Sequence, residues 1–221
     1  MQPRNWQIEA FVFDFDGTLA ELNIDFPLMR KSVLRIVEGF DCAVDSLQHM
    51  FVLEMIDEAK ELIARRRPAG AEDFLAAAYE LITDIEMEAA RRGGLFADTR
   101  DMLRDLRKRG MKTGVISRNC LAAITTAFPD IHDYCNAVMT RESVLRVKPH
   151  PDHLNAALYS LEAAAEHAAM VGDHPMDIEL GKRVGTRTVG VLTGHSNYRR
   201  LHEAGADIIL AKASDIVTLI S

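Results

Sequence analysis

Short apolar runs alternate with amphipathic segments from about position 97 onward, and one more apolar run lies near the start of the chain. That first run, AFVFD at 10–14, ends at a polar turn, and the segment 98–109 has helical spacing between an acidic start and Gly110. Later strands are predicted at 111–117, 136–140, 168–172, 188–192 and 206–210, and later helices at 120–127 (with Asn119 as N-cap), 152–162 and 177–184. Strands that alternate with helices predict an α/β fold, a Rossmann-like three-layer sandwich around a parallel sheet.

The stretch 20–96 breaks this alternation, because it contains no run with the pattern of a strand. Three long amphipathic segments occupy it, at 27–39, 46–67 and 71–92, with breaks at Pro68-Ala69-Gly70 and Gly93-Gly94. We therefore predict an all-helical cap domain of four or five helices at 20–96. The core domain would then consist of two pieces, 1–19 and 97–221.

The composition narrows the class of protein. Apolar residues make up 48% of the 221 residues, and the net charge is −7, which disfavours nucleic-acid binding because such proteins neutralise phosphates with Lys and Arg. No apolar run approaches the ~20 residues of a membrane span, and the first nine residues lack the apolar stretch of a signal peptide. The cysteines (Cys42, Cys120, Cys135) have no metal-binding spacing, which predicts reduced thiols and a cytoplasmic location. The sequence does not indicate an oligomeric state.

Polar side chains follow four of the predicted strands, close to where each strand ends. They are Asp14 and Asp16 after the first strand, Ser117 after the second, Lys148 beyond the third, and Asp173 and Asp177 after the fourth. Ligands of open parallel sheets bind outside the carboxyl ends of the strands, so we expect these side chains to converge. One such cluster could be a turn cap or a strand end, whereas four clusters in order indicate a site.

The residue types at this site favour phosphoryl transfer. Asp14, Asp16 and Asp173 would raise one another's pKa values by repulsion unless a cation lay among them, and Mg²⁺ prefers oxygen ligands of this kind. Lys148 adds a positive charge and Ser117 a hydroxyl donor, both suited to phosphoryl oxygens. We therefore predict a Mg²⁺ cofactor and a phosphorylated substrate.

The same residues resemble the motifs of a known family. DFDGTL at 14–19, the strand-ending Ser117, the pair Lys148-Pro149 and GDHPMD at 172–177 are similar, in order, to the four motifs of the haloacid dehalogenase superfamily. The resemblance is strongest to its phosphoglycolate-phosphatase and phosphomutase-like branch, and it covers the whole chain, including a helical cap inserted after the first motif. Arg118 and His174 depart from the common pattern, which leaves the substrate open.

The resemblance implies a role for each residue. Asp14 would attack phosphorus and form an aspartyl-phosphate, and Asp16 would protonate the leaving oxygen and then activate water. The carboxylates of Asp14 and Asp173 and the main-chain carbonyl of Asp16 would bind Mg²⁺, while Asp177 would orient a metal-bound water or Lys148. The residues expected to bind the substrate are Thr18, Ser117, Arg118 and Lys148.

The predicted function is hydrolysis of a small phosphorylated metabolite, with phosphoglycolate suggested by analogy alone. A phosphomutase with the same intermediate, or a catalytically silent regulatory or binding protein on the same fold, are the alternatives. The run Arg65–Arg67 is expected at a helix C-terminus, where it forms a solvated face or supplies an arginine to a substrate carboxylate. His153 and His195 are expected to serve packing or to lie at the surface.

Overall fold

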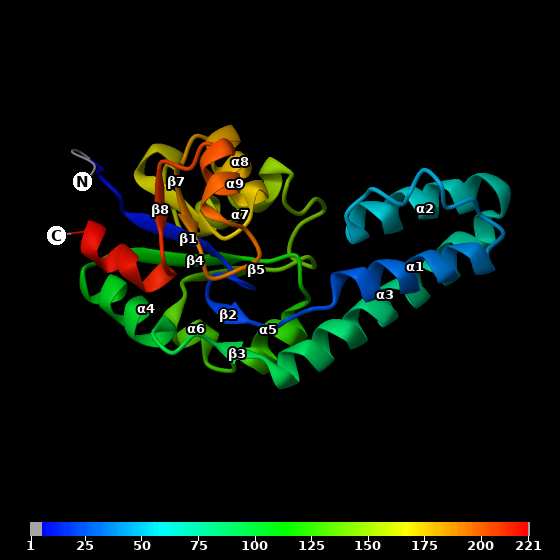
Figure 1. Cartoon of the computed structure of the whole chain (residues 1–221), viewed down its shortest axis with the longest axis horizontal. Coiled ribbons are helices and arrows are strands. Elements are labelled where there is room, and N and C mark those ends of the chain that lie inside the picture. Colours follow the sequence, from blue (N-terminus) through cyan, green and yellow to red (C-terminus); the bar gives the residue numbers. More distant parts are fainter. Residues whose placement is uncertain (1–5, 221) are drawn as a thin grey trace. The chain divides into compact units, whose positions relative to one another are not determined.

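The computed structural model describes residues 6–220, which form two compact units. The first unit comprises the chain up to Leu22 and from Ala90 onward, and the second comprises Asn23–Ala89. Figure 1 labels the helices and strands of both units. No helix among the described residues has both the length and the apolar character needed to cross a membrane.

The first unit is built on a six-stranded sheet of order β5-β4-β1-β6-β7-β8, in which every pair of neighbours is parallel. The strands are β1 (Ala10–Asp14), β4 (Lys112–Ile116), β5 (Ala137–Met139), β6 (Ala168–Gly172), β7 (Arg187–Val191) and β8 (Ile208–Leu210). All five residues of β1 are buried, as expected for a central parallel strand that is covered on both faces. The predicted α/β fold with a parallel sheet is confirmed.

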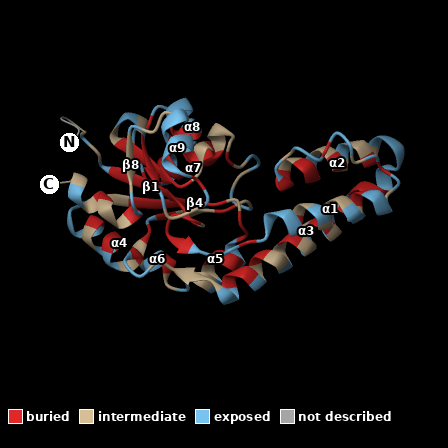
Figure 2. Ribbon diagram, viewed as in Figure 1, coloured by how far each residue is buried: buried red, intermediate tan, exposed pale blue. Residues whose placement is uncertain are grey.

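Helices cover both faces of this sheet (Figure 1). Those on one face are α7 (Pro151–Ser160), α8 (Pro175–Val184) and α9 (Tyr198–Glu203), and those on the other are α4 (Thr99–Lys108), α5 (Leu121–Ala127) and α6 (Ile131–Tyr134). The unit also contains two short 3₁₀ segments, η1 (Ala165–His167) and η2 (Ala213–Leu219). Figure 2 shows the buried residues gathered on the strands and on the inner faces of the helices.

One predicted cap was wrong by one residue. The N-cap of α5 is Cys120 and not Asn119, since the Cys120 Sγ accepts a hydrogen bond from the Ala123 N–H at 3.4 Å. A thiol is a weak hydrogen-bond acceptor, whereas asparagine is a common N-cap residue, so the sequence favoured Asn119. All three cysteines are buried thiols.

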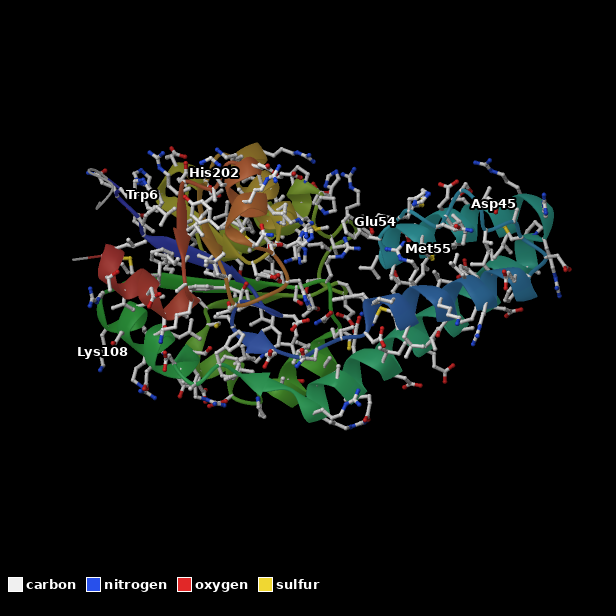
Figure 3. All side chains as sticks on the ribbon, in the orientation of Figure 1. Trp6, Asp45, Glu54, Met55, Lys108 and His202 are labelled. Atoms are coloured by element: carbon white, nitrogen blue, oxygen red, sulfur yellow. The ribbon has the colours of Figure 1, made fainter. Side chains whose placement is uncertain are left out.

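The second unit is helical. It contains α1 (Phe26–Gly39), α2 (Val52–Arg66) and most of α3 (Pro68–Arg92), so the prediction of four or five helices was wrong. The side chain of Met55 in α2 is fully buried and is labelled in Figure 3. Arg66, in the last turn of α2, donates a hydrogen bond to the Asp41 carbonyl oxygen at 3.0 Å.

Three details of the insertion differ from prediction. The segment expected to start a helix at Ser46 forms turns up to Met50, and α2 starts only at Val52. The predicted break at Pro68-Ala69-Gly70 is instead the first turn of α3, because proline is tolerated in the first turn of a helix. Two-residue strands, β2 (Ala20–Glu21) and β3 (Gly94–Leu95), pair antiparallel at the two ends of the insertion, and they are too short to leave a pattern in the sequence.

Candidate active site

Asp14 ends the central strand β1 and is buried in the first unit. Its neighbours across the sheet are Ile116 of β4 and the end of β6, so the carboxyl ends of three strands lie side by side around it. The Asp14 Oδ1 accepts a hydrogen bond from the Phe15 N–H at 2.7 Å, which fixes the orientation of the carboxylate. A buried carboxylate is thus held on rigid backbone at the edge of the sheet where ligands of parallel sheets bind.

Lys148 places its ammonium group between two carboxylates. The Lys148 Nζ lies 2.5 Å from Asp14 Oδ1 and 2.8 Å from Asp177 Oδ1, and all three side chains are buried. Burial lowers the pKa of Lys148, but the charges of Asp14 and Asp177 raise it by more, so the net pKa is above its ordinary value. The lysine therefore stays charged at neutral pH.

Three buried carboxylates, those of Asp14, Asp173 and Asp177, have oxygens within 4.8 Å of one another. Burial, reinforced by the charges of Asp14 and Asp177, raises the pKa of Asp173 to about 7. Burial also raises the pKa of Asp14 to about 6, although the Lys148 charge opposes it. One lysine does not balance three carboxylates, and a divalent cation among these oxygens would relieve the excess charge. The donor set fits Mg²⁺, which takes oxygen ligands.

Asp16 lies beside this cluster but its side chain is not part of it. The Asp16 Oδ1 accepts a hydrogen bond from the Leu22 N–H at 2.9 Å, and the residue is half-buried. Burial raises the pKa of Asp16 to about 6, while the Leu22 N–H lowers it by less. The carboxyl group is thus poised to gain or lose a proton near neutral pH.

The two hydroxyl residues follow neighbouring strands: Ser117 comes directly after β4, and Thr18 lies in the turn after β1. Ser117 follows Ile116, the residue that pairs with Asp14, and its Oγ accepts a hydrogen bond from the Asn119 N–H at 3.2 Å. Thr18 is buried, and among residues 6–220 its Oγ1 has no hydrogen-bond partner. A buried hydroxyl without a protein partner suits a ligand oxygen. Arg118, by contrast, donates a hydrogen bond to the Lys148 carbonyl oxygen.

His174 and Asp177 together form the start of α8. The His174 Nδ1 accepts from the Met176 N–H at 3.1 Å, and the Asp177 Oδ2 accepts from the His174 N–H at 3.2 Å. This reciprocal cap fixes the Asp177 side chain, so that its other oxygen, Oδ1, meets Lys148. His174 therefore caps α8 through its ring nitrogen.

The loop after β7 belongs to the site and was missed from the sequence. The His195 N–H donates to Asp173 Oδ2 at 3.0 Å, and the Thr193 Oγ1 donates to the Gly17 carbonyl oxygen at 2.6 Å. A Cβ at Gly194 would lie 1.9 Å from Asp173 Oδ2, so only glycine permits this approach. Thr193 comes directly after the fifth predicted strand, and the strand-end argument used for the other clusters would have included it.

The fold and the buried acidic cluster are those of a phosphohydrolase. Residues 11–191 match the family described as Haloacid dehalogenase-like hydrolase, and the chain belongs to that family. Among its relatives are proteins named Pyrophosphatase PpaX from Bacillus cereus and Bacillus anthracis, each 28% identical to this chain, with 97% of both chains covered.

Solved structures of similar fold cover nearly the whole chain. A hydrolase from Pseudomonas syringae has a TM-score of 0.72 at 19% identity and covers 96% of this chain and 97% of its own. CbbY from Rhodobacter sphaeroides, solved in complex with phosphate, has a TM-score of 0.63 at 23% identity, with 95% and 96% covered. At these identities the likeness shows the fold alone.

Proposed function

We propose that this chain is a Mg²⁺-dependent phosphatase that hydrolyses a small phosphorylated metabolite through an aspartyl-phosphate on Asp14. One observation carries the proposal: the buried Asp14 carboxylate meets the Lys148 ammonium at 2.5 Å within a group of carboxylates that can hold a metal. A carboxylate is a competent nucleophile without a base, and the lysine places positive charge where phosphoryl oxygens would lie.

The carboxylates of Asp14 and Asp173 and the main-chain carbonyl of Asp16 would hold Mg²⁺. When bound, the ion neutralises charge on the phosphoryl group. Asp177 lies close enough to share in this site, and it also fixes Lys148. Lys148 and Ser117 would bind phosphoryl oxygens, with Thr18 as a further donor.

Asp16 would act as the general acid and then as the general base. Its raised pKa of about 6 supports this role, because it can hold a proton for the leaving oxygen and later accept one from water. The hydrogen bond from the Leu22 N–H to Oδ1 would keep the carboxyl group in place through both steps.

Two substrates are supported by different arguments. Phosphoglycolate follows from the sequence resemblance, whereas inorganic pyrophosphate follows from the names of relatives that span 97% of the chain. Both are small anions whose transferred group is a phosphoryl. The three buried thiols support a cytoplasmic location, and the helical insertion supports a cap that selects the substrate.

The direct test is release of inorganic phosphate from pyrophosphate, phosphoglycolate, several sugar phosphates and p-nitrophenyl phosphate. Wild-type protein in Mg²⁺ should release phosphate, and EDTA or the substitution Asp14→Asn should abolish release. Isomerisation of a sugar phosphate without phosphate release would instead indicate a phosphomutase. Equal signals from wild type and Asp14→Asn would show that the chain is not an enzyme of this type.

A further inference from the structure

His153 lies in α7 and is fully buried, and each nitrogen of its ring has a main-chain partner. The Nδ1 accepts a hydrogen bond from the Lys148 N–H at 3.1 Å, and the Nε2 meets the Met139 carbonyl oxygen at 3.0 Å. Buried polar atoms need hydrogen-bond partners, and both partners of this ring are main-chain atoms that belong to different segments. The ring therefore joins the loop of Lys148 to the end of β5.

The carbonyl oxygen at the end of β5 is shared with the site. The Ser117 N–H also donates to Met139 O, at 2.9 Å. His153 thus links the main chain of Lys148 to the same oxygen that holds Ser117. On the other side of the Lys148 residue, Arg118 donates to its carbonyl oxygen, so both main-chain polar groups of Lys148 are bound by side chains.

The two hydrogen bonds of the ring require one and the same form of histidine. Nδ1 must be unprotonated to accept from the Lys148 N–H, and Nε2 must carry the proton that is donated to Met139 O. Burial, with the nearby Lys148 charge, lowers the pKa of His153 to about 4, so the ring is neutral at neutral pH. The neutral ring protonated at Nε2 is therefore the form that makes both hydrogen bonds.

We propose that His153 is a positioning residue, whose neutral ring holds the main chain of Lys148 so that its ammonium group reaches Asp14 and Asp177. The inference rests on the proposed function, because the role of Lys148 is to bind the phosphoryl group. A lysine side chain has many rotamers, and a fixed main chain restricts the positions that its Nζ can reach.

Two substitutions at His153 separate positioning from packing. His153→Asn retains an acceptor near the Lys148 N–H but loses ring volume, whereas His153→Phe retains the ring volume but loses both hydrogen bonds. If His153 positions Lys148, hydrolysis of p-nitrophenyl phosphate should fall roughly tenfold in His153→Phe and by less in His153→Asn. The inhibition constant for vanadate, an anion that would contact Lys148, should rise in the same order.

Leu158→Ala serves as the matched control, because Leu158 is buried in the same helix and belongs to the core cluster on that face of the sheet. It should lower the melting temperature yet leave kcat and the vanadate constant within about twofold of wild type. A wild-type kcat and vanadate constant in His153→Phe would overturn the inference, and so would a larger loss in His153→Asn than in His153→Phe.

A measurement on the wild type decides the matter even if a variant fails to fold. Long-range ¹H–¹⁵N spectra at pH 7 should show His153 neutral and protonated at Nε2, and a ring protonated at Nδ1 would overturn the inference. Absence of turnover in the wild type would refute the proposed function instead. The tautomer, together with slow hydrogen exchange at the Lys148 amide of the wild type, would then decide this inference.

Discussion

The Nζ of Lys148 lies 2.5 Å from Oδ1 of Asp14, and the two residues are 134 positions apart in the sequence (148 − 14). The pair is buried, and a second carboxylate, that of Asp177, accepts from the same ammonium group. The buried Lys148 charge can therefore compensate only the negative charge of these carboxylates or of a ligand bound beside them. The stability and the chemistry of the site therefore depend on the same contact.

Removing the lysine charge should damage both properties. In Lys148→Met, two buried carboxylates lose their partner, so the free energy of unfolding should fall by about 3 kcal/mol at pH 7 in EDTA. Phosphate release should fall roughly a hundredfold or more, because a charge that stabilises the phosphoryl group is lost. Urea unfolding and phosphate release measure the two effects.

The matched control is Lys212→Met, which removes an exposed lysine that pairs with Asp98. Surface pairs contribute little, so neither unfolding nor activity should change measurably. Equal losses of stability in the two variants would contradict the buried role assigned to Lys148.

The pH dependence of stability should reveal the metal site. Burial raises the pKa of Asp14, Asp16 and Asp173 to about 6, 6 and 7, above the ordinary 3.8. The folded protein therefore holds protons that the unfolded chain has released, which favours folding at low pH. In EDTA, stability should fall as the pH rises from 5 to 8.

Added Mg²⁺ should reverse this trend. The ion binds the ionised carboxylates of the folded state, so the stability that it adds should be larger at pH 8 than at pH 5. Urea unfolding at four pH values, with Mg²⁺ or with EDTA, measures the difference. An increment that did not depend on pH would argue against binding at these carboxylates.

Gly194→Ala should weaken metal binding although it replaces none of the proposed ligands. Its Cβ would lie 1.9 Å from Asp173 Oδ2, so either Asp173 or the loop that donates the His195 N–H must move. The Mg²⁺ concentration for half-maximal activity should rise by about tenfold or more, as for other losses of support around a metal ligand. Thermal-shift titration with Mg²⁺ should show the same displacement.

Gly94→Ala is the control for this change, because a Cβ at Gly94 meets no atom within 4 Å. Its half-maximal Mg²⁺ concentration should equal that of wild type. A Gly194→Ala protein with unchanged metal affinity would show that the loop after β7 does not support Asp173.

The parts of this site that could be predicted from the sequence are the polar residues that follow the carboxyl ends of strands. The bounds of β1 and β6 were predicted correctly, because a short apolar run that meets an aspartate, at Asp14 or just before Asp173, is unambiguous. The hydrogen bonds that His153 and Arg118 make to the main chain of Lys148 could not be predicted. The fold of the loop 140–150 decides which main-chain atoms face the His153 ring. The two-residue strands depend likewise on tertiary contacts rather than on propensity. The Cys120 cap is a local bond to the Ala123 N–H, but a thiol is too weak an acceptor to be expected as a cap.

Asp16 provides the sharpest test of mechanism, because its proposed task depends on the leaving group. Asp16→Asn keeps an oxygen that can accept from the Leu22 N–H, so the loop should persist, but it cannot donate a proton as a carboxylic acid does. p-Nitrophenolate leaves readily without protonation, whereas an alkoxide does not. The variant should therefore lose roughly a hundredfold or more in kcat on an alkyl phosphate and much less in formation of the aspartyl-phosphate from p-nitrophenyl phosphate.

Rapid-mixing measurement of the p-nitrophenolate burst separates that first step from hydrolysis of the intermediate, which the loss of the base should slow for both substrates. An equal loss in the first step for both leaving groups would remove Asp16 from the role of general acid and leave it as a support for the loop.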